Sequence, residues 1–343
     1  MAPVPQAPKQ RSVTLRDGRA LCFSTWEVRQ PKGANINSSS DTPPVIVLYL
    51  HGFPGTKLEC EIVCEAALEQ GIAAGEVRDG RGAVIVALDR PGFGDSSSRQ
   101  GWAPRWTLLD VASDCMQLID HLSCDAFAVV GVSGGGPYAL AVAAHCQATG
   151  DKRCRGVTLV ASVCCAGSLD GMMAANQMMS RLIRFSPWLA PWLLWLNFSV
   201  MRVLAIWFPG LLEKQMTGSR MNNVLPEVDV AVMKEKWPRL LRGLQGALRH
   251  GAWCAAMEAS LLFSCKWGFQ LGNIEMPVAV FHGESDSNVP ICQGRYLAKM
   301  LPNSKLEEFK GLGHVSLVVT KAAAYVATAL RQAAGSSMAD PVQ

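Results

Sequence analysis

Short apolar segments alternate with segments of helical periodicity along most of the chain. The apolar segments cover residues 45–50, 83–88, 126–131, 157–161 and 278–281, and a shorter one covers 306–309. Helical spacing of apolar positions marks residues 58–70, 107–121, 137–146, 291–300 and 316–331. Strands that are apolar on both faces are typical of a parallel sheet covered by helices on both sides. The pattern therefore predicts an α/β fold with a mostly parallel central sheet and helices on both faces.

The two ends of the chain follow a different pattern. Residues 12–28 form two β-rich runs around Asp17-Gly18, a pair that favours a tight turn, and so predict an antiparallel hairpin at the edge of the sheet. Residues 30–44 are polar and rich in turn formers, which predicts a mobile loop. Residues 1–11 and 335–343 are expected to be flexible tails.

The alternation of strands and helices stops between residues 165 and 266. This segment holds most of the Trp and Met residues and shows no strand pattern, but its leucines recur at helical spacing. It predicts an all-helical cap inserted into the sheet-forming core. The core would then consist of residues 12–164 and 267–334.

Part of the predicted cap, residues 186–212, is apolar over a length that could cross a membrane. Pro187, Pro191 and Arg202 interrupt this segment and Pro209 ends it. A single span would also place the two halves of the predicted sheet on opposite sides of the membrane. The sequence therefore favours a cap that packs over the sheet, with its Trp side chains in the cap core. It leaves open a peripheral contact of the cap with membrane or lipid.

Composition and charge narrow the class of protein further. The 343 residues are 49% hydrophobic and 17% charged, which is typical of a folded chain and excludes wholesale disorder. The net charge of +4 is spread without a basic stripe, so nucleic acid is not an expected partner. The 12 cysteines lack zinc-site spacing and indicate free thiols in a reducing compartment. Residues 1–11 show no secretory or transit pattern, so a cytoplasmic location is expected.

One glycine-rich segment lies between a predicted strand and a predicted helix. Its sequence, Gly131-Val132-Ser133-Gly134-Gly135, fits the G-x-S-x-G pattern of a nucleophile elbow. In such an elbow a serine occupies a strained turn, and glycines flank it because side chains there would clash. The helix that follows would favour negative charge developing near its first residues. The sequence therefore predicts Ser133 as a nucleophile.

A second loop, His51-Gly-Phe-Pro-Gly55, follows the first predicted parallel strand. A loop at this position can aim the backbone N–H of Phe53 at the space above Ser133. The N–H of Gly134 would be the second donor, and the two would form an oxyanion hole for a tetrahedral intermediate. We expect His51 to brace this loop and not to act as an acid or base.

Five motifs follow one another in the order found in a known family. They are His51-Gly-Phe-Pro-Gly55, Asp89-Arg-Pro-Gly-Phe-Gly-Asp-Ser96, Gly131-Val-Ser-Gly-Gly-Gly-Pro-Tyr-Ala-Leu140, His282-Gly-Glu-Ser-Asp-Ser-Asn-Val-Pro290 and Gly311-Leu-Gly-His-Val-Ser316. Together they resemble the α/β-hydrolase superfamily, in its serine-hydrolase branch with a helical cap. The resemblance covers nearly all of the chain outside the insertion and the tails. It is specific for the fold and says little about the substrate.

The resemblance implies a catalytic acid that follows the serine in the chain. Asp286 lies in the loop after the strand at 278–281, where the family usually carries this acid. Glu284 in the same loop and Asp170, after the strand at 157–161, are the competing candidates. Some members of the family take their acid from that earlier strand.

The general base is the last member of the set that the resemblance implies. Of the six histidines, His51 and His282 lie in His-Gly turns, and His121, His145 and His250 lie in or beside predicted helices. His314 alone lies in a short glycine loop between the last strand and the last helix. A loop of this kind can carry an imidazole of near-neutral pKa to the sheet edge. His314 is therefore the predicted base.

These residues predict a serine hydrolase that cleaves a carboxylic ester through an acyl-enzyme on Ser133. No metal or organic cofactor is needed for this chemistry. The expected partner is a small apolar ester, and an apolar segment at Pro187–Pro209 that roofs the pocket would favour medium or long acyl chains. An amidase or aminopeptidase-like hydrolase is the alternative enzyme, and a non-catalytic ligand-binding protein is the alternative from another class. The sequence does not predict the oligomeric state.

Overall fold

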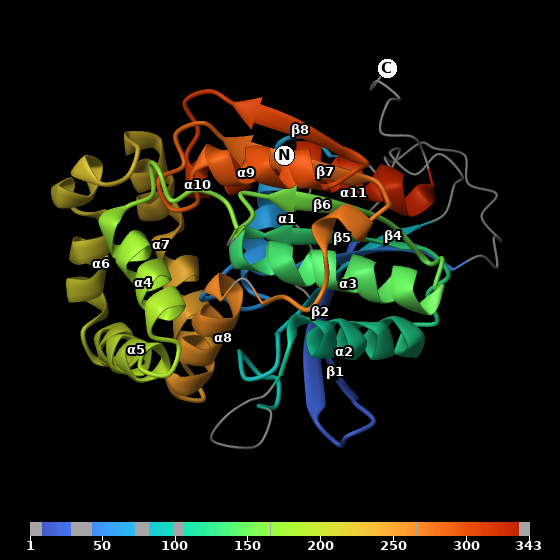
Figure 1. Cartoon of the computed structure of the whole chain (residues 1–343), viewed down its shortest axis with the longest axis horizontal. Coiled ribbons are helices and arrows are strands. Elements are labelled where there is room, and N and C mark those ends of the chain that lie inside the picture. The colour runs from blue at the N-terminus through green and yellow to red at the C-terminus, as the bar shows by residue number, and fades with distance from the viewer. Residues whose placement is uncertain are drawn as a thin grey trace.

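The computed structural model of the protein describes residues 9–28, 43–72, 82–98, 106–164, 166–264 and 266–335. Its central feature is one eight-stranded sheet with the strand order β1-β2-β4-β3-β5-β6-β7-β8 (Figure 1). The strands are β1 (Lys9–Thr14), β2 (Ala20–Val28), β3 (Val45–Leu50), β4 (Ala83–Leu88), β5 (Phe127–Val132), β6 (Cys154–Val160), β7 (Val278–Gly283) and β8 (Ser304–Phe309). β1 and β2 pair antiparallel at one edge, β2 also pairs antiparallel with β4, and all other pairs are parallel.

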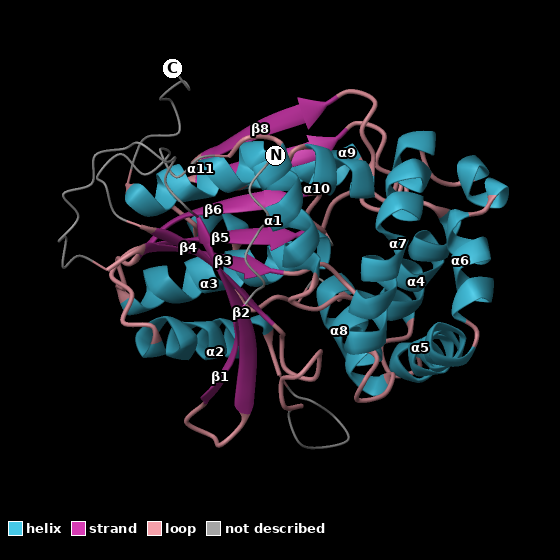
Figure 2. Ribbon diagram, turned by 180° about the vertical axis from the view of Figure 1, so that it is seen from behind, coloured by secondary structure: helices cyan, strands magenta, loops and turns pink. Residues whose placement is uncertain are grey.

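Helices cover both faces of the sheet, as the sequence predicts (Figure 2). The helices of the core are α1 (Glu59–Glu69), α2 (Leu108–His121), α3 (Gly136–Thr149), α9 (Ile291–Met300), α10 (His314–Thr320) and α11 (Ala322–Ala334). Side chains of α2, α3 and α9 pack in one apolar core, and those of α1, α10 and α11 pack in the core on the opposite face. Every residue of β3 and β5 is buried, which explains their uninterrupted apolar sequences.

Five helices lie between β6 and β7 and form the insertion. They are α4 (Ala174–Phe185), α5 (Ala190–Trp207), α6 (Pro209–Thr217), α7 (Glu227–Ala247) and α8 (Trp253–Phe263). No strand occurs in the described residues between β6 and β7, which agrees with an all-helical insertion. Figures 1 and 2 show these helices gathered beyond the ends of the strands, with α5 and α6 on the outside.

Three expectations about the ends of elements need correction. Residues 9–11 belong to β1 and not to a flexible tail, because backbone pairing with β2 orders an edge strand even where its side chains are exposed. The predicted helix at 316–331 is two helices, α10 and α11, separated at Lys321. Gly335, which was expected to begin a flexible tail, adopts the left-handed conformation that ends α11. Residues 1–8, residues 30–42 of the predicted loop at 30–44, and residues 336–343 lie outside the described residues.

Candidate active site

Ser133 lies at the turn between β5 and α3. Its backbone φ is +51°, a left-handed value that a serine seldom adopts and that holds its side chain at the end of the strand. A Cβ on Gly131 would lie 2.7 Å from the carbonyl oxygen of Gly135, and one on Gly135 would collide with the carbonyl oxygen of Leu50. The tight turn thus requires glycine on both sides of Ser133, as expected for a nucleophile elbow.

The structure brings Ser133, His314 and Asp286 into one hydrogen-bonded chain. Nε2 of His314 lies 2.9 Å from Oγ of Ser133, and Nδ1 of His314 lies 2.7 Å from Oδ2 of Asp286. The second oxygen of Asp286 accepts the backbone N–H groups of Asn288 and Val289 at 2.9 and 2.8 Å, which fixes the carboxylate. The competing acids, Glu284 and Asp170, are both exposed.

The charges around His314 favour its protonated form. Burial by itself lowers the pKa of the imidazole, but the neighbouring carboxylate of Asp286 and its hydrogen bond raise it. Asp229 and Glu59 raise it further, and the net result is a pKa above the ordinary value. An imidazole in this position accepts a proton readily and is stabilised once it carries the charge.

His314 is the first residue of α10 and not part of a mobile glycine loop, which corrects the sequence-based interpretation. The cause is Asp229, a fully buried residue of α7 in the insertion. Its carboxylate accepts the backbone N–H of His314 at 2.8 Å, the N–H of Ser316 at 2.8 Å and the hydroxyl of Ser316 at 2.6 Å. These bonds satisfy the free N–H groups at the start of α10, so the insertion holds the histidine in place.

The loop after β3 lies directly against the elbow. A Cβ on Gly134 would lie 3.3 Å from the backbone nitrogen of Phe53, so the two predicted oxyanion donors are close neighbours. Glu59 of α1 anchors this loop, because its carboxylate accepts the N–H of Gly52 at 3.0 Å and the hydroxyl of Tyr49 at 2.7 Å. Burial raises the pKa of Glu59 above its ordinary value, although these hydrogen bonds act against the shift.

Arg90 is fully buried and contacts the same loop. Its guanidinium donates to the carbonyl oxygens of His51 and Gly52, and it forms a two-point ion pair with Glu258 of α8 at 2.6 and 3.1 Å. The ring of His51 donates to Gly52 O at 2.8 Å, and burial together with the charge of Arg90 holds the pKa of His51 well below its ordinary value. His51 is thus a neutral structural residue.

A cavity of about 140 Å³ opens beside Ser133 and His314. Its other walls are mostly apolar and come from four parts of the chain: Gly52, Phe53, Pro54, Glu59, Ile62, Val63, Val132, Lys236, Leu240, Val315, Val318 and Val319. The insertion contributes Lys236 and Leu240 of α7 to this lining, and not the Trp-rich segment that the sequence placed there. That segment contacts the loop after β3 through Phe198 of α5, whose ring packs edge-on against Phe53 with 5.6 Å between the ring centroids.

Comparison with known proteins agrees with the observed fold. Residues 45–203 match the protein family described as "alpha/beta hydrolase fold". The chain has the α/β-hydrolase fold. No curated protein sequence matches it significantly.

Several solved α/β-hydrolase structures align over nearly the whole chain. A hydrolase from Pseudomonas aeruginosa PA01 is 17% identical with a TM-score of 0.59, and the alignment covers 93% of this chain and 97% of that one. A thermophilic esterase from Thermogutta terrifontis is 17% identical with a TM-score of 0.55 and coverage of 94% and 97%. A bromoperoxidase from Bacillus anthracis is 18% identical with a TM-score of 0.55 and coverage of 95% and 98%. At such identities the likeness concerns the fold, and the different activities of these proteins show that function depends on the site.

Three carboxylates around the site were not foreseen from the sequence: the half-buried Glu59 and the fully buried Asp229 and Glu258. Glu59 follows the His51–Gly55 motif by four residues, so its position in the chain was a usable signal. Asp229 and Glu258 lie in the insertion, where no motif marks them.

Proposed function

We propose that this protein is a serine hydrolase that cleaves carboxylic esters through an acyl-enzyme on Ser133. The observation that carries the proposal is the continuous chain from Ser133 Oγ through His314 to Asp286, at 2.9 and 2.7 Å, beside an open cavity. The base lies within hydrogen-bond distance of both the nucleophile and the orienting acid, which is the arrangement that acyl transfer requires.

In the proposed mechanism His314 Nε2 takes the proton of Ser133 as Oγ attacks the ester carbonyl. The backbone N–H groups of Phe53 and Gly134 bind the oxyanion of the tetrahedral intermediate. Asp286 orients the imidazole and stabilises the imidazolium, which then gives its proton to the departing alcohol. Water, activated by His314, attacks the acyl-enzyme and releases the carboxylic acid with Ser133 restored.

The cavity bears on the size of the substrate. The sequence predicts a preference for medium or long acyl chains, but a volume of about 140 Å³ is below the range of roughly 300–1,000 Å³ that holds a drug-sized ligand. This favours a short acyl group beside Ser133. The mostly apolar walls favour an uncharged, apolar acyl group over a polar one.

Labelling with a fluorophosphonate probe tests the proposal directly. The folded protein should be labelled at Ser133, and Ser133→Ala should abolish the labelling. Ser219→Ala, which changes an exposed serine of the insertion, is the matched control and should label normally. Folded wild-type protein that takes up no label would contradict the enzyme hypothesis and favour a ligand-binding protein.

A pair of substrates with the same acyl group separates the enzyme alternatives. An ester and the corresponding amide or aminoacyl amide are compared at equal concentration. A higher kcat/KM for the ester supports the proposal, and a higher value for the amide supports an amidase or aminopeptidase-like enzyme.

A cytoplasmic location is also part of the proposal. It is supported by the thiols, since Cys60, Cys64 and Cys115 are among the free cysteines of the described residues and are buried. Fractionation of cells that express the tagged protein tests this point, and recovery in a secreted fraction would contradict it.

A further inference from the structure

The insertion carries most of the exposed apolar surface of the molecule. Of the 16 large apolar side chains that are exposed in the described residues, 13 lie on α4, α5, α6 and the turns between them. They are Met178, Phe185, Trp188, Trp192, Leu193, Trp195, Leu196, Val200, Val203, Ile206, Trp207, Phe208 and Leu211, and we call them the outer face of the insertion. The sequence-based expectation that the Trp side chains form the cap core is wrong for four of them, since Trp188 and Trp207 are each 74% exposed, Trp192 is 52% and Trp195 is 43%.

The helix α5 accounts for most of this surface. It is the one helix in the described part of the chain that is long and apolar enough to cross a membrane, yet only 22% of it is buried. Its buried residues, Ala190, Leu194, Phe198 and Ala205, form a single narrow stripe toward the protein. A surface helix of a water-soluble domain normally turns polar residues outward, whereas the exposed side of α5 is Trp, Leu, Val and Ile apart from Asn197.

The inner contacts of α5 exclude a spanning helix. Phe198 packs on Phe53 beside the active site, and Nε of Arg202 donates to the carbonyl oxygen of Leu248 at 3.0 Å. The segment also leaves the sheet after β6 and returns to β7, which is the strand next to β6. If only the outward side of α5 contacts a membrane surface, the inner contacts of the helix are kept and the apolar side chains of the outer face are removed from water.

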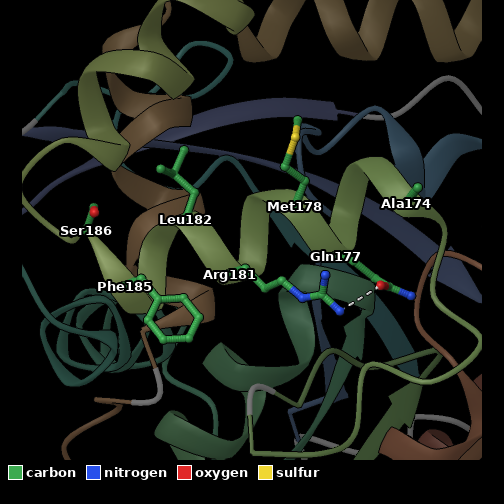
Figure 3. Close-up of a pocket in the computed structure, with 7 residues that line it drawn as sticks. All are labelled: Ala174, Gln177, Met178, Arg181, Leu182, Phe185 and Ser186. Atoms are coloured by element: carbon green, nitrogen blue, oxygen red, sulfur yellow. Dashed lines mark hydrogen bonds between the residues drawn. The ribbon is translucent and has the colours of Figure 1, made fainter.

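The segment that carries the outer face is basic. Between residues 171 and 224 the chain has five basic residues and one acidic residue, Glu213. Four of the basic residues, Arg181, Arg184, Lys214 and Arg220, are exposed. Figure 3 shows Arg181 and Phe185 extending from the same side of α4, where they border an open hollow of about 370 Å³. Basic groups beside aromatic and aliphatic ones match the headgroup region of an anionic bilayer.

A second copy of this chain is a less suitable occupant. A two-fold dimer through the outer face would bring the same basic residues of both copies together, with one acidic residue in each copy's segment to offset them. Anionic lipid would neutralise these charges, and Trp is a side chain favoured at the membrane–water boundary. We propose that the outer face of the insertion binds the surface of an anionic lipid membrane, with α5 lying along the bilayer.

Binding to vesicles tests this inference without using catalysis, so it succeeds or fails independently of the proposed function. The protein is sedimented with vesicles of phosphatidylcholine alone and of phosphatidylcholine with phosphatidylserine. We expect binding to the vesicles with phosphatidylserine and weaker binding to the neutral ones. Trp188→Ser with Trp207→Ser should weaken binding about tenfold or more, because two deeply placed anchors are lost. Arg181→Ser with Lys214→Ser should weaken only the binding to anionic vesicles, by about tenfold.

The matched control is Met300→Ser, which removes an exposed apolar side chain of α9 outside the outer face and should leave binding unchanged. If a tryptophan variant does not fold, quenching of the wild-type tryptophan fluorescence by brominated lipid gives the same answer and is expected to be strong. No binding to either vesicle, or no quenching, overturns the inference. So does a concentration-dependent dimer that the tryptophan variant abolishes, or protein that resists extraction from vesicles at alkaline pH as a spanning helix would.

Discussion

The carboxylate of Asp229 gives the most decisive test of how the insertion supports the site. It accepts three hydrogen bonds, two from backbone N–H groups and one from the Ser316 hydroxyl, and all three lie between 2.6 and 2.8 Å. In Asp229→Asn the single amide oxygen can keep two of these bonds at most, and the new NH₂ group faces a donor. With charge-assisted bonds contributing about 1.5–3 kcal/mol each, the loss in free energy of unfolding should be about 2–4 kcal/mol.

The catalytic effect of Asp229→Asn should be separate from the loss of stability. The bond from His314 N–H fixes where the imidazole stands, and misplacing a reacting group by about 1 Å costs on the order of 10² in rate. We therefore expect kcat for a soluble ester to fall about 10²-fold with little change in KM. His314 must be neutral to act as the base, so the rate falls as the pH drops through its pKa. Burial lowers the pKa of His314, whereas the charges of Asp286, Asp229 and Glu59 raise it. Removing the charge of Asp229 should therefore lower this pKa and move the acid limb of the kcat/KM profile to lower pH.

The control for Asp229→Asn is Glu227→Gln, which removes an exposed carboxylate from the same first turn of α7. It should leave kcat and the acid limb unchanged. The measurements are the pH profile of kcat/KM and urea denaturation of both variants. If Asp229→Asn lowers stability but leaves kcat and the acid limb where they were, Asp229 is only structural and the reasoning is refuted.

The other predictions concern the acid, the buried ion pair and the cavity. Asp286→Asn should lower kcat by about 10⁴-fold with the fold intact, whereas Asp170→Asn should be nearly neutral, and the opposite order in steady-state assays would move the acid to the segment after β6. Glu258→Gln should lower the free energy of unfolding by about 3–5 kcal/mol in urea denaturation, because it leaves the buried charge of Arg90 without its partner; a loss under about 1 kcal/mol would contradict this. In a series of esters from acetyl to decanoyl, kcat/KM should peak at short chains, and a steady rise to decanoyl would show that the cavity beside Ser133 does not set the acyl length.

Much of the fold could be predicted because its strands are buried on both faces. The apolar segments at 45–50 and 83–88 coincide with β3 and β4 residue for residue. The turn at Ser133 was also predictable, since only a sequence with glycine on both sides fits between β5 and α3. These features depend on neighbours in the chain, and such local constraints leave a direct mark on the sequence.

Contacts between distant parts of the chain could not be predicted in the same way. The bond between Asp229 and His314 joins positions 85 residues apart, and that between Arg90 and Glu258 joins positions 168 apart. The break at Lys321 was missed because apolar residues keep their helical spacing across it. Both helices pack against α1, but α10 also packs against α7, whereas α11 packs against β3, β5 and β6. Apolar composition likewise does not reveal exposure, so the Trp residues of α5 resembled a core in the sequence and lie on the surface in the structure.

The insertion therefore has two sides with different chemistry, and they involve different helices. On the inner side, α7 holds the start of α10 through Asp229, and α8 holds the loop at His51–Gly55 through Glu258 and Arg90, in both cases by fully buried charged groups. On the outer side, α4, α5 and α6 carry apolar and basic side chains that make few contacts with the core. Breaking the buried ion pair of α8 or the charge-assisted hydrogen bonds of Asp229 would leave a buried charge without its partners, so both helices are fixed to the sheet-forming core. A membrane that binds the outer face can then concentrate an apolar ester near the site while the positions of Ser133, His314 and Asp286 remain those of the free protein.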